Sequence, residues 1–204
     1  MGYYCDSEDS PTVVIVDLET TGLDIGAHVM QVAAKCGRSI FNAYILPWKP
    51  ISPQAAQITG FSRAGMNLFV HGVRKNTLTV HDAVDQFIRF LRSMGGNVVL
   101  VAHNAFNFDA FHLLRLVCSA GLWDELHEVC IGFSDTLPLY RKMYPYLGNH
   151  GLARLLQEFV PDEYFPLHNA VGDVRALDRL IEVTGLCDTA LINSMRPLDD
   201  LYQC

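Results

Sequence analysis

Three observations predict an α/β fold, with a mixed central sheet flanked by helices in a single domain. Two short apolar runs, at 13–16 and 98–102, have the length and composition of buried strands. Segments with apolar residues at helical spacing, such as 80–94 and 170–184, separate further strands. Strands alternating with helices in the second half favour parallel pairing, whereas short connections in the first half favour an antiparallel meander.

The elements of the first half follow from residue periodicity and from turn residues. After the run at 13–16, strands are expected at 29–34 and 39–46. A short helix is expected next, with Ser52 as its N-cap and Pro53 at its first position. Residues 62–79 are expected to be irregular, because Gly65 and Gly72 interrupt any regular pattern.

The second half is expected to alternate helices with strands. The expected elements are helix 80–94, strand 98–102, a helix from about 108, strand 129–133, helices near 136–143 and 150–159, and helix 170–184. We expect a flexible tail at 1–11, one domain over 12–186, and a C-terminal extension at 187–204 that packs on the domain or trails it.

The bulk composition is that of a folded domain with an acidic balance. The chain has 204 residues, 50% hydrophobic and 18% charged, which predicts a globular fold. A formal net charge of −7 argues against a broad coat of Lys and Arg that binds nucleic acid by neutralising phosphates. It leaves a metal-dependent nuclease open, because divalent cations make an acidic site attractive to phosphate.

Cysteine spacing and hydropathy indicate the cellular compartment in which the protein is expected. The six cysteines include no C-x-x-C pair, so we expect scattered reduced thiols and neither a zinc site nor a disulfide framework. No apolar run approaches the ~20 residues of a membrane helix, and the N-terminus lacks a signal-peptide pattern. The expectation is a soluble, cytoplasmic or nuclear protein without a membrane partner.

Two acids, Asp17 and Glu19, end the first apolar run. In a strand, residues two apart point to the same face. Two carboxylates side by side at the end of a buried strand repel each other, so a cation between them is expected. A polar strand end with two solvated acids is the more common meaning of an isolated D-x-E.

The rest of the chain favours a cation bound between these acids over two solvated acids. Acids and histidines also gather at 103–109 and at 168–173, and sites of α/β sheets lie beyond the carboxyl ends of the strands. Carboxylates from three distant segments suit a pair of hard divalent cations, which can clamp the oxygens of a phosphoryl displacement. A neutral histidine is the expected general base for the attacking water.

These residues carry a family resemblance over about 12–186. The motifs are Asp17-Leu18-Glu19-Thr20-Thr21-Gly22-Leu23, Ala102-His103-Asn104-Ala105-Phe106-Asn107-Phe108-Asp109 and His168-Asn169-Ala170-Val171-Gly172-Asp173. They resemble the three motifs of the DEDDh (DnaQ-like) 3′→5′ exonucleases, which have a ribonuclease H-like fold. The spacing from His103 to Asp109, and Ile51-Ser52-Pro53 followed by Ile58-Thr59-Gly60-Phe61-Ser62, resemble the TREX type.

The resemblance implies the roles of the site residues. Asp17, Glu19, Asp109 and Asp173 are expected to bind two Mg²⁺ or Mn²⁺ ions, and His168 to activate water. The residues expected to bind substrate are Leu18, Thr20, Leu23, Ile58, His103, Asn104 and Phe108. A Tyr is usual at the position of Phe108 in TREX enzymes, so any contact made by its hydroxyl is absent. A homodimer through an edge strand is expected by analogy.

For several side chains, a purely structural role is an alternative to a role in the functional site. A structural hydrogen-bonded role for His103 is as well founded as contact with the site. For Asp135 an N-cap role is favoured over metal ligation, and for Arg74 and Lys75 a solvated loop is favoured over steering of nucleic acid. Trp48 and Trp123 are expected to be partly buried.

Three functional hypotheses follow. The first is a metal-dependent exonuclease that releases 5′-mononucleotides from the 3′ end of DNA, either single-stranded or at duplex ends. Single-stranded DNA is preferred because an unpaired end reaches a buried site at least cost. The second is an RNA exonuclease with the same motifs. The third is a non-catalytic interaction module that retains the exonuclease fold.

Overall fold

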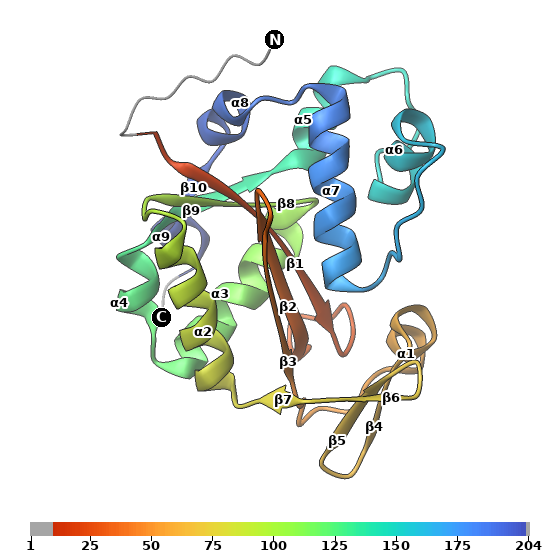
Figure 1. The fold of residues 1–204 in the computed structure, drawn as a ribbon, viewed down its shortest axis with the longest axis vertical. Coiled ribbons are helices and arrows are strands. Elements are labelled where there is room, and N and C mark those ends of the chain that lie inside the picture. The colour runs from red at the N-terminus through yellow and green to blue at the C-terminus, as the bar shows by residue number, and fades with distance from the viewer. Residues whose placement is uncertain (1–9, 203–204) are drawn as a thin grey trace.

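The computed structural model describes residues 10–202 and has a central seven-stranded sheet with helices on both faces (Figure 1). The strands are β1 Thr12–Thr20, β2 Val29–Cys36, β3 Ser39–Ile45, β4 Phe61–Ala64, β5 Asn67–Val70, β6 Val73–Lys75, β7 Thr77–Leu78, β8 Val98–Ala102, β9 Cys130–Asp135 and β10 Arg196–Pro197. The helices are α1 Pro53–Thr59, α2 Val80–Ser93, the 3₁₀ turn η1 Ala105–Asn107, α3 Asp109–Ala120, α4 Trp123–His127, α5 Thr136–Met143, α6 Leu152–Phe159, α7 Ala170–Thr184, α8 Asp188–Asn193 and α9 Leu198–Leu201.

The pairing of the central sheet confirms the predicted mixed topology. The strand order is β10-β9-β8-β1-β2-β3-β7. Strands β1, β2 and β3 form an antiparallel meander, while β8 pairs parallel to both β1 and β9. The carboxyl ends of β1, β8 and β9 therefore lie at one edge of the sheet, which is where the predicted site was expected.

The alternation of β1 decides which side chains meet which helices. Val14, Val16 and Leu18 belong to the core under α2 and α3. Ile15 belongs to the opposite core, which includes residues of α5, α6 and α7. Because the period of a strand is two residues, Asp17 and Glu19 share the face of Ile15 and point to the α7 side.

The expectation that residues 62–79 are irregular is wrong. Strands β4, β5 and β6 form an antiparallel three-stranded sheet, and β7 pairs with β3. The inward-facing Phe61, Leu68 and Val70 form a small core with Met30. Strands β4, β5 and β6 have only three or four residues and β7 has two, too few for a clear alternation to show in the sequence. The small sheet and α1 lie together, away from the centre of the large sheet (Figure 1).

Two further expectations need correction. Trp48 is not partly buried: its side chain is 73% exposed, with the Arg63 guanidinium over its ring. Cys118 is disulfide-bonded, so the expectation of reduced thiols throughout is wrong for it, whereas Cys36, Cys130 and Cys187 are free.

At the C-terminal end, β10 pairs with β9, and Leu191 and Leu198 are buried in the two main cores. The tail expected at 1–11 falls mostly outside the described residues. None of the helices in residues 10–202 is long and apolar enough to cross a membrane.

Candidate active site

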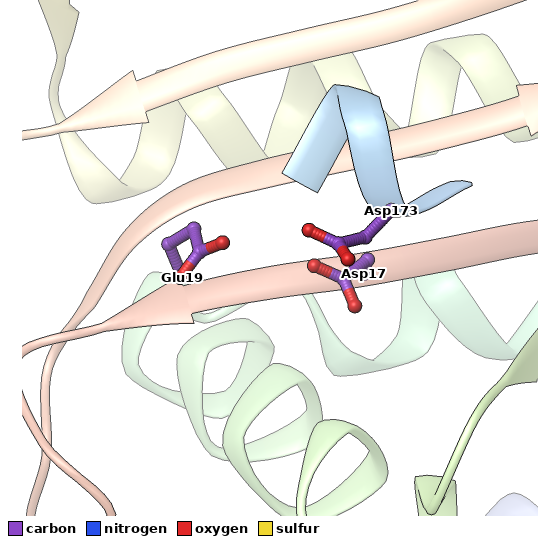
Figure 2. A group of neighbouring side chains, drawn as sticks. All are labelled: Asp17, Glu19 and Asp173. Carbon is purple, nitrogen blue, oxygen red and sulfur yellow. The ribbon is translucent and has the colours of Figure 1, made fainter. Parts of the chain in front are cut away.

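Three of the four predicted metal ligands meet at the end of β1. One carboxylate oxygen each from Asp17, Glu19 and Asp173 lie within 4.8 Å of one another. Figure 2 shows the three side chains together, with Asp17 and Glu19 rising from β1 toward Asp173 in the first turn of α7. Acidic groups from two segments about 150 residues apart in sequence are thus brought together.

The raised pKa values of these acids show that their buried, close arrangement is unfavourable for the charged forms. Burial and the charges of Asp173 and Asp109 raise the pKa of Glu19 to about 8. Burial raises the pKa of Asp173 to about 6, and burial with the neighbouring acids raises that of Asp17 well above its ordinary value. None of the ion pairs among residues 10–202 involves these carboxylates. Apart from the charge of His168, which acts on Asp173, the repulsion is therefore not offset by an ion pair in the described protein.

Asp109, the fourth predicted ligand, begins α3 and is only 4% exposed. It does not belong to the group of three, but its charge is the strongest neighbouring influence that raises the pKa of Asp17. Burial raises its own pKa to about 7, while a hydrogen bond from the backbone N–H of Leu18 acts in the opposite direction. That bond ties the start of α3 to β1.

The donor set fits hard divalent cations. Carboxylate oxygens are the ligands that Mg²⁺ and Mn²⁺ favour. The charges of these acids repel one another, and no basic group of the described residues lowers the pKa of Asp17 or Glu19. A bound cation would lower the raised pKa values and offset the repulsion. Asp17, Glu19 and Asp173 would hold such an ion, with Asp109 beside Asp17.

The predicted base, His168, is exposed and precedes α7 with a positive φ of 62°. The charge of His168 acts on the Asp173 carboxylate, which also accepts the backbone N–H of Asn169 at 3.0 Å. The approach of this loop to α7 depends on Gly172, where a Cβ would lie 2.1 Å from the Pro166 carbonyl oxygen. The glycine therefore lets residues 166–168 lie against the helix.

A cavity of about 270 Å³ opens beside the acids. Five of the seven predicted substrate-binding residues line it together with Glu19 and His168: Leu18, Thr20, Leu23, Ile58 and Phe108. Gln54 of α1, which the sequence did not single out, also lines it. Leu23 is 81% exposed, so an apolar side chain stands free at the rim of an acidic site.

Arg115 of α3 holds the loop that carries Leu23. Its guanidinium donates to the backbone carbonyls of Ile25 and Ala27. The same guanidinium lies near His112, where burial and this positive charge lower the imidazole pKa to about 4. The His112 ring packs against Phe108. Helix α3 thus contacts both the loop that follows Leu23 and the Phe108 ring, two parts of the cavity wall.

His103 and Asn104 do not line the cavity. Both ring nitrogens of His103 have partners, the Thr136 hydroxyl at 2.9 Å and the His150 carbonyl at 2.8 Å. This geometry favours the structural role of His103, and contact with substrate stays a prediction. Asp135 is the N-cap of α5, as predicted, and also accepts the backbone N–H of Asn104 at 2.8 Å. It therefore fixes the turn that leads to Asp109.

Gln31 is a buried residue that sequence reasoning missed. It lies opposite Glu19 in the β1–β2 pair, and its Oε1 accepts the backbone N–H of Ala170 at 3.3 Å. Its Nε2 donates to Asn42 at 2.9 Å. Gln31 thereby holds the start of α7, and hence Asp173, over the end of β1. The signal that could have identified it is a polar Gln within an otherwise apolar strand segment.

Comparison with known proteins agrees with this geometry. Residues 14–180 match the exonuclease family RNase_T. DNA polymerase III of the PolC type is 30% identical over 176 residues in Listeria innocua and 31% over 179 residues in Bacillus subtilis, covering 82% and 85% of this chain. The chain spans only about a tenth of the length of these curated relatives, 11% in each case.

Solved structures show the same fold. A structure of exonuclease I aligns over 90% of this chain and 43% of its own, with a TM-score of 0.70 and 17% identity. The zinc-bound complex of E. coli exonuclease I with single-stranded DNA aligns over 91% of this chain and 42% of its own, with a TM-score of 0.65 and 17% identity. The fold is the ribonuclease H-like exonuclease fold. The chain belongs to the exonuclease family, as a member of its DEDDh type.

Proposed function

We propose that this domain is a divalent-cation-dependent 3′→5′ exonuclease that releases 5′-mononucleotides from single-stranded DNA. One observation carries the proposal: the three converging acids lie beside a cavity of about 270 Å³ that His168 lines. Reacting groups, a candidate base and room for one small ligand therefore occupy one place.

Each residue has a role that follows from its position. Asp17, Glu19, Asp109 and Asp173 hold the divalent cations, which when bound polarise the scissile phosphate and neutralise charge that develops on it. An imidazole nitrogen of His168 takes the proton of the attacking water, and its exposed position lets it pass the proton to solvent. Gly172 and Asn169 orient the loop that presents this ring.

Recognition of a chain end follows from the cavity walls. Leu23, Ile58 and Phe108 offer apolar surface for the sugar and base of one nucleotide. Stacking on apolar side chains does not depend on the identity of the base, so the terminal nucleotide is bound whichever base it carries. The polymerase relatives and the single-stranded DNA in the exonuclease I complex support DNA as the substrate class.

The test is degradation of 3′- and 5′-labelled oligonucleotides as single-stranded DNA, duplex DNA and RNA, with Mg²⁺ and with EDTA. We expect stepwise release of 5′-mononucleotides from the 3′ end, fastest on single-stranded DNA and absent in EDTA. Asp17→Asn should abolish release, and His168→Ala should reduce it about 10²–10⁴-fold. Circular dichroism should show that both variants are folded.

Other outcomes decide between the alternatives. Faster turnover of RNA would make the domain an RNA exonuclease. Wild-type activity no higher than that of Asp17→Asn would favour a non-catalytic interaction module. The closeness to the TREX type and the homodimer stay predictions.

A further inference from the structure

An uninterrupted stretch of this acidic chain contains no acid. Between Asp24 and Asp82 there is no Asp or Glu, although the whole chain has 22 acids and a net charge of −7. The same stretch contains six of the 15 basic residues: Lys35, Arg38, Lys49, Arg63, Arg74 and Lys75. Lys35 pairs with Asp178 and Lys49 with Asp24, both acids outside the stretch. Arg63, Arg74 and Lys75 of the small sheet β4–β6 take part in none of the ion pairs of the described residues, so this sheet forms a positive region beside α1.

This positive region lies next to the nucleotide cavity. Gln54, Ala55 and Ile58 of α1 line that cavity. Ala56, on the same helix, lines a second cavity of about 460 Å³, together with Trp48, Phe61 and Arg63. Figure 1 shows α1 beside the small sheet, at one end of the molecule. The helix therefore separates the nucleotide cavity from a second, larger hollow.

Trp48 forms a flat, exposed platform at this second cavity. Its side chain is 73% exposed, and the Arg63 guanidinium lies 5.9 Å from the centre of the ring. Arg63 is fixed by hydrogen bonds from Nε to the Gly65 carbonyl at 2.8 Å and from Nη1 to the Pro47 carbonyl at 2.5 Å. None of the ion pairs of the described residues involves Arg63. An aromatic face and an uncompensated positive charge therefore stand together.

We propose that the Trp48–Arg63 cavity binds the single-stranded nucleic acid upstream of the nucleotide held at the active site. The inference rests on the proposed exonuclease function for the direction in which the strand runs. An unpaired base stacks on the free face of the Trp48 indole, and the positive region attracts the phosphates. An acidic strand with exposed bases complements both features, the charge and the aromatic surface.

The width of α1 sets how far upstream the contact lies. A helix with its side chains is about 10–12 Å across, which corresponds to about three nucleotides at the ~3.4 Å rise of a stacked strand. Substrates of two nucleotides occupy the nucleotide cavity alone, whereas substrates of six reach Trp48. The contact therefore lowers KM only for the longer substrates.

The first experiment measures KM for DNA oligonucleotides of two, four, six and ten nucleotides. For the wild type, KM should fall about tenfold between two and six nucleotides, which is within the range for loss of one stacked base. Trp48→Ala should remove that fall, and Trp48→Phe should restore most of it. Tyr146→Ala, which removes another exposed aromatic side chain far along the chain, is the control and should keep the wild-type length dependence.

A binding measurement separates this proposal from the proposed function. The chain has two tryptophans, so quenching of intrinsic fluorescence by a ten-nucleotide DNA in EDTA can be assigned by comparison with Trp48→Phe. Quenching that depends on Trp48, in a protein that releases no nucleotide, would retain the docking surface and refute the exonuclease. Nucleotide release with neither Trp48-dependent quenching nor Trp48-dependent KM would overturn the docking surface.

Discussion

Replacing Glu19 by Gln should stabilise the metal-free protein, although Glu19 is a proposed ligand. The residue is 8% exposed, and a carboxylate oxygen lies close to those of Asp17 and Asp173. Glutamine keeps the shape of the side chain and removes its charge, so the repulsion within the cluster falls. The expected sign is opposite to that of most substitutions at buried positions, which destabilise.

The magnitude follows from the pKa of Glu19, which rises from 4.5 to about 8. An ionised carboxylate with that pKa destabilises the folded state by up to about 5 kcal/mol. Water in the adjoining cavity screens part of this, so we expect Glu19→Gln to add about 1–3 kcal/mol at pH 8 in EDTA. For a chain of this size each kcal/mol raises the melting temperature by about 2–4 °C.

The pH dependence has a defined sign. Between pH 4.5 and 8 the folded state keeps the proton of Glu19 while the unfolded state has lost it. The wild type is therefore destabilised progressively as the pH rises through that window. The advantage of Glu19→Gln should shrink to below about 1 kcal/mol at pH 5, where the folded wild type is already neutral at this position.

Calorimetry with and without Mg²⁺ tests the account. Mg²⁺ at 100 times its Kd should add about 2.7 kcal/mol to the wild type and much less to Glu19→Gln, which reverses their order. Glu125→Gln, which removes an exposed carboxylate, is the control and should change stability by less than about 0.5 kcal/mol in both conditions. A Glu19→Gln variant less stable than the wild type in EDTA at pH 8 would refute the repulsion.

Three further predictions concern the cavity, the base and the cations. Arg115→Met should free the loop that carries Leu23, raise KM several-fold with a smaller change in kcat, and speed amide hydrogen exchange at 23–27. Gly172→Ala should push the Pro166 carbonyl away and displace His168, lowering kcat at least tenfold and stability by about 1–3 kcal/mol in denaturant titrations. The apparent Mg²⁺ affinity measured by titration calorimetry should fall at least tenfold from pH 8 to pH 6, because the raised carboxyl pKa values make cations compete with protons.

Matched controls make these results specific. Arg89→Met removes an exposed Arg that pairs with Asp85 on α2, and it should leave KM unchanged. Gly148→Ala adds a Cβ where no atom lies within 4 Å, and it should leave kcat unchanged. An Arg115→Met enzyme with wild-type KM would show that the loop holds Leu23 without the clamp. A Mg²⁺ affinity independent of pH would contradict the raised pKa values.

The meeting of the acids could be predicted because it depends on local rules. The two-residue period of β1 places Asp17 and Glu19 on one face. Parallel pairing of β1 with β8 brings the segment that leads to Asp109 to the same edge. A strong helical period from Ala170 placed Asp173 in the first turn of α7. Each step used a periodicity that a short stretch of sequence contains.

The residues that were missed act through contacts that no local pattern encodes. Arg115 reaches the Ile25 carbonyl across 90 positions of sequence, and a single Arg on a helix gives no sign of that partner. The role of Gln31 in holding the start of α7 can be recognised only once the structure shows that α7 lies over β1. The exposure of Trp48 likewise depends on the small sheet, whose strands are too short to detect by alternation.

The central claim is that acids from distant segments hold divalent cations at the end of β1. The most direct measurement is an anomalous-difference map from crystals soaked in Mn²⁺ with a nucleoside 5′-monophosphate. We predict Mn²⁺ bound by Asp17, Glu19 and Asp173, with the phosphate against the metal and the base in the cavity lined by Leu23 and Phe108. Mn²⁺ bound elsewhere, with no density among these three carboxylates, would contradict it.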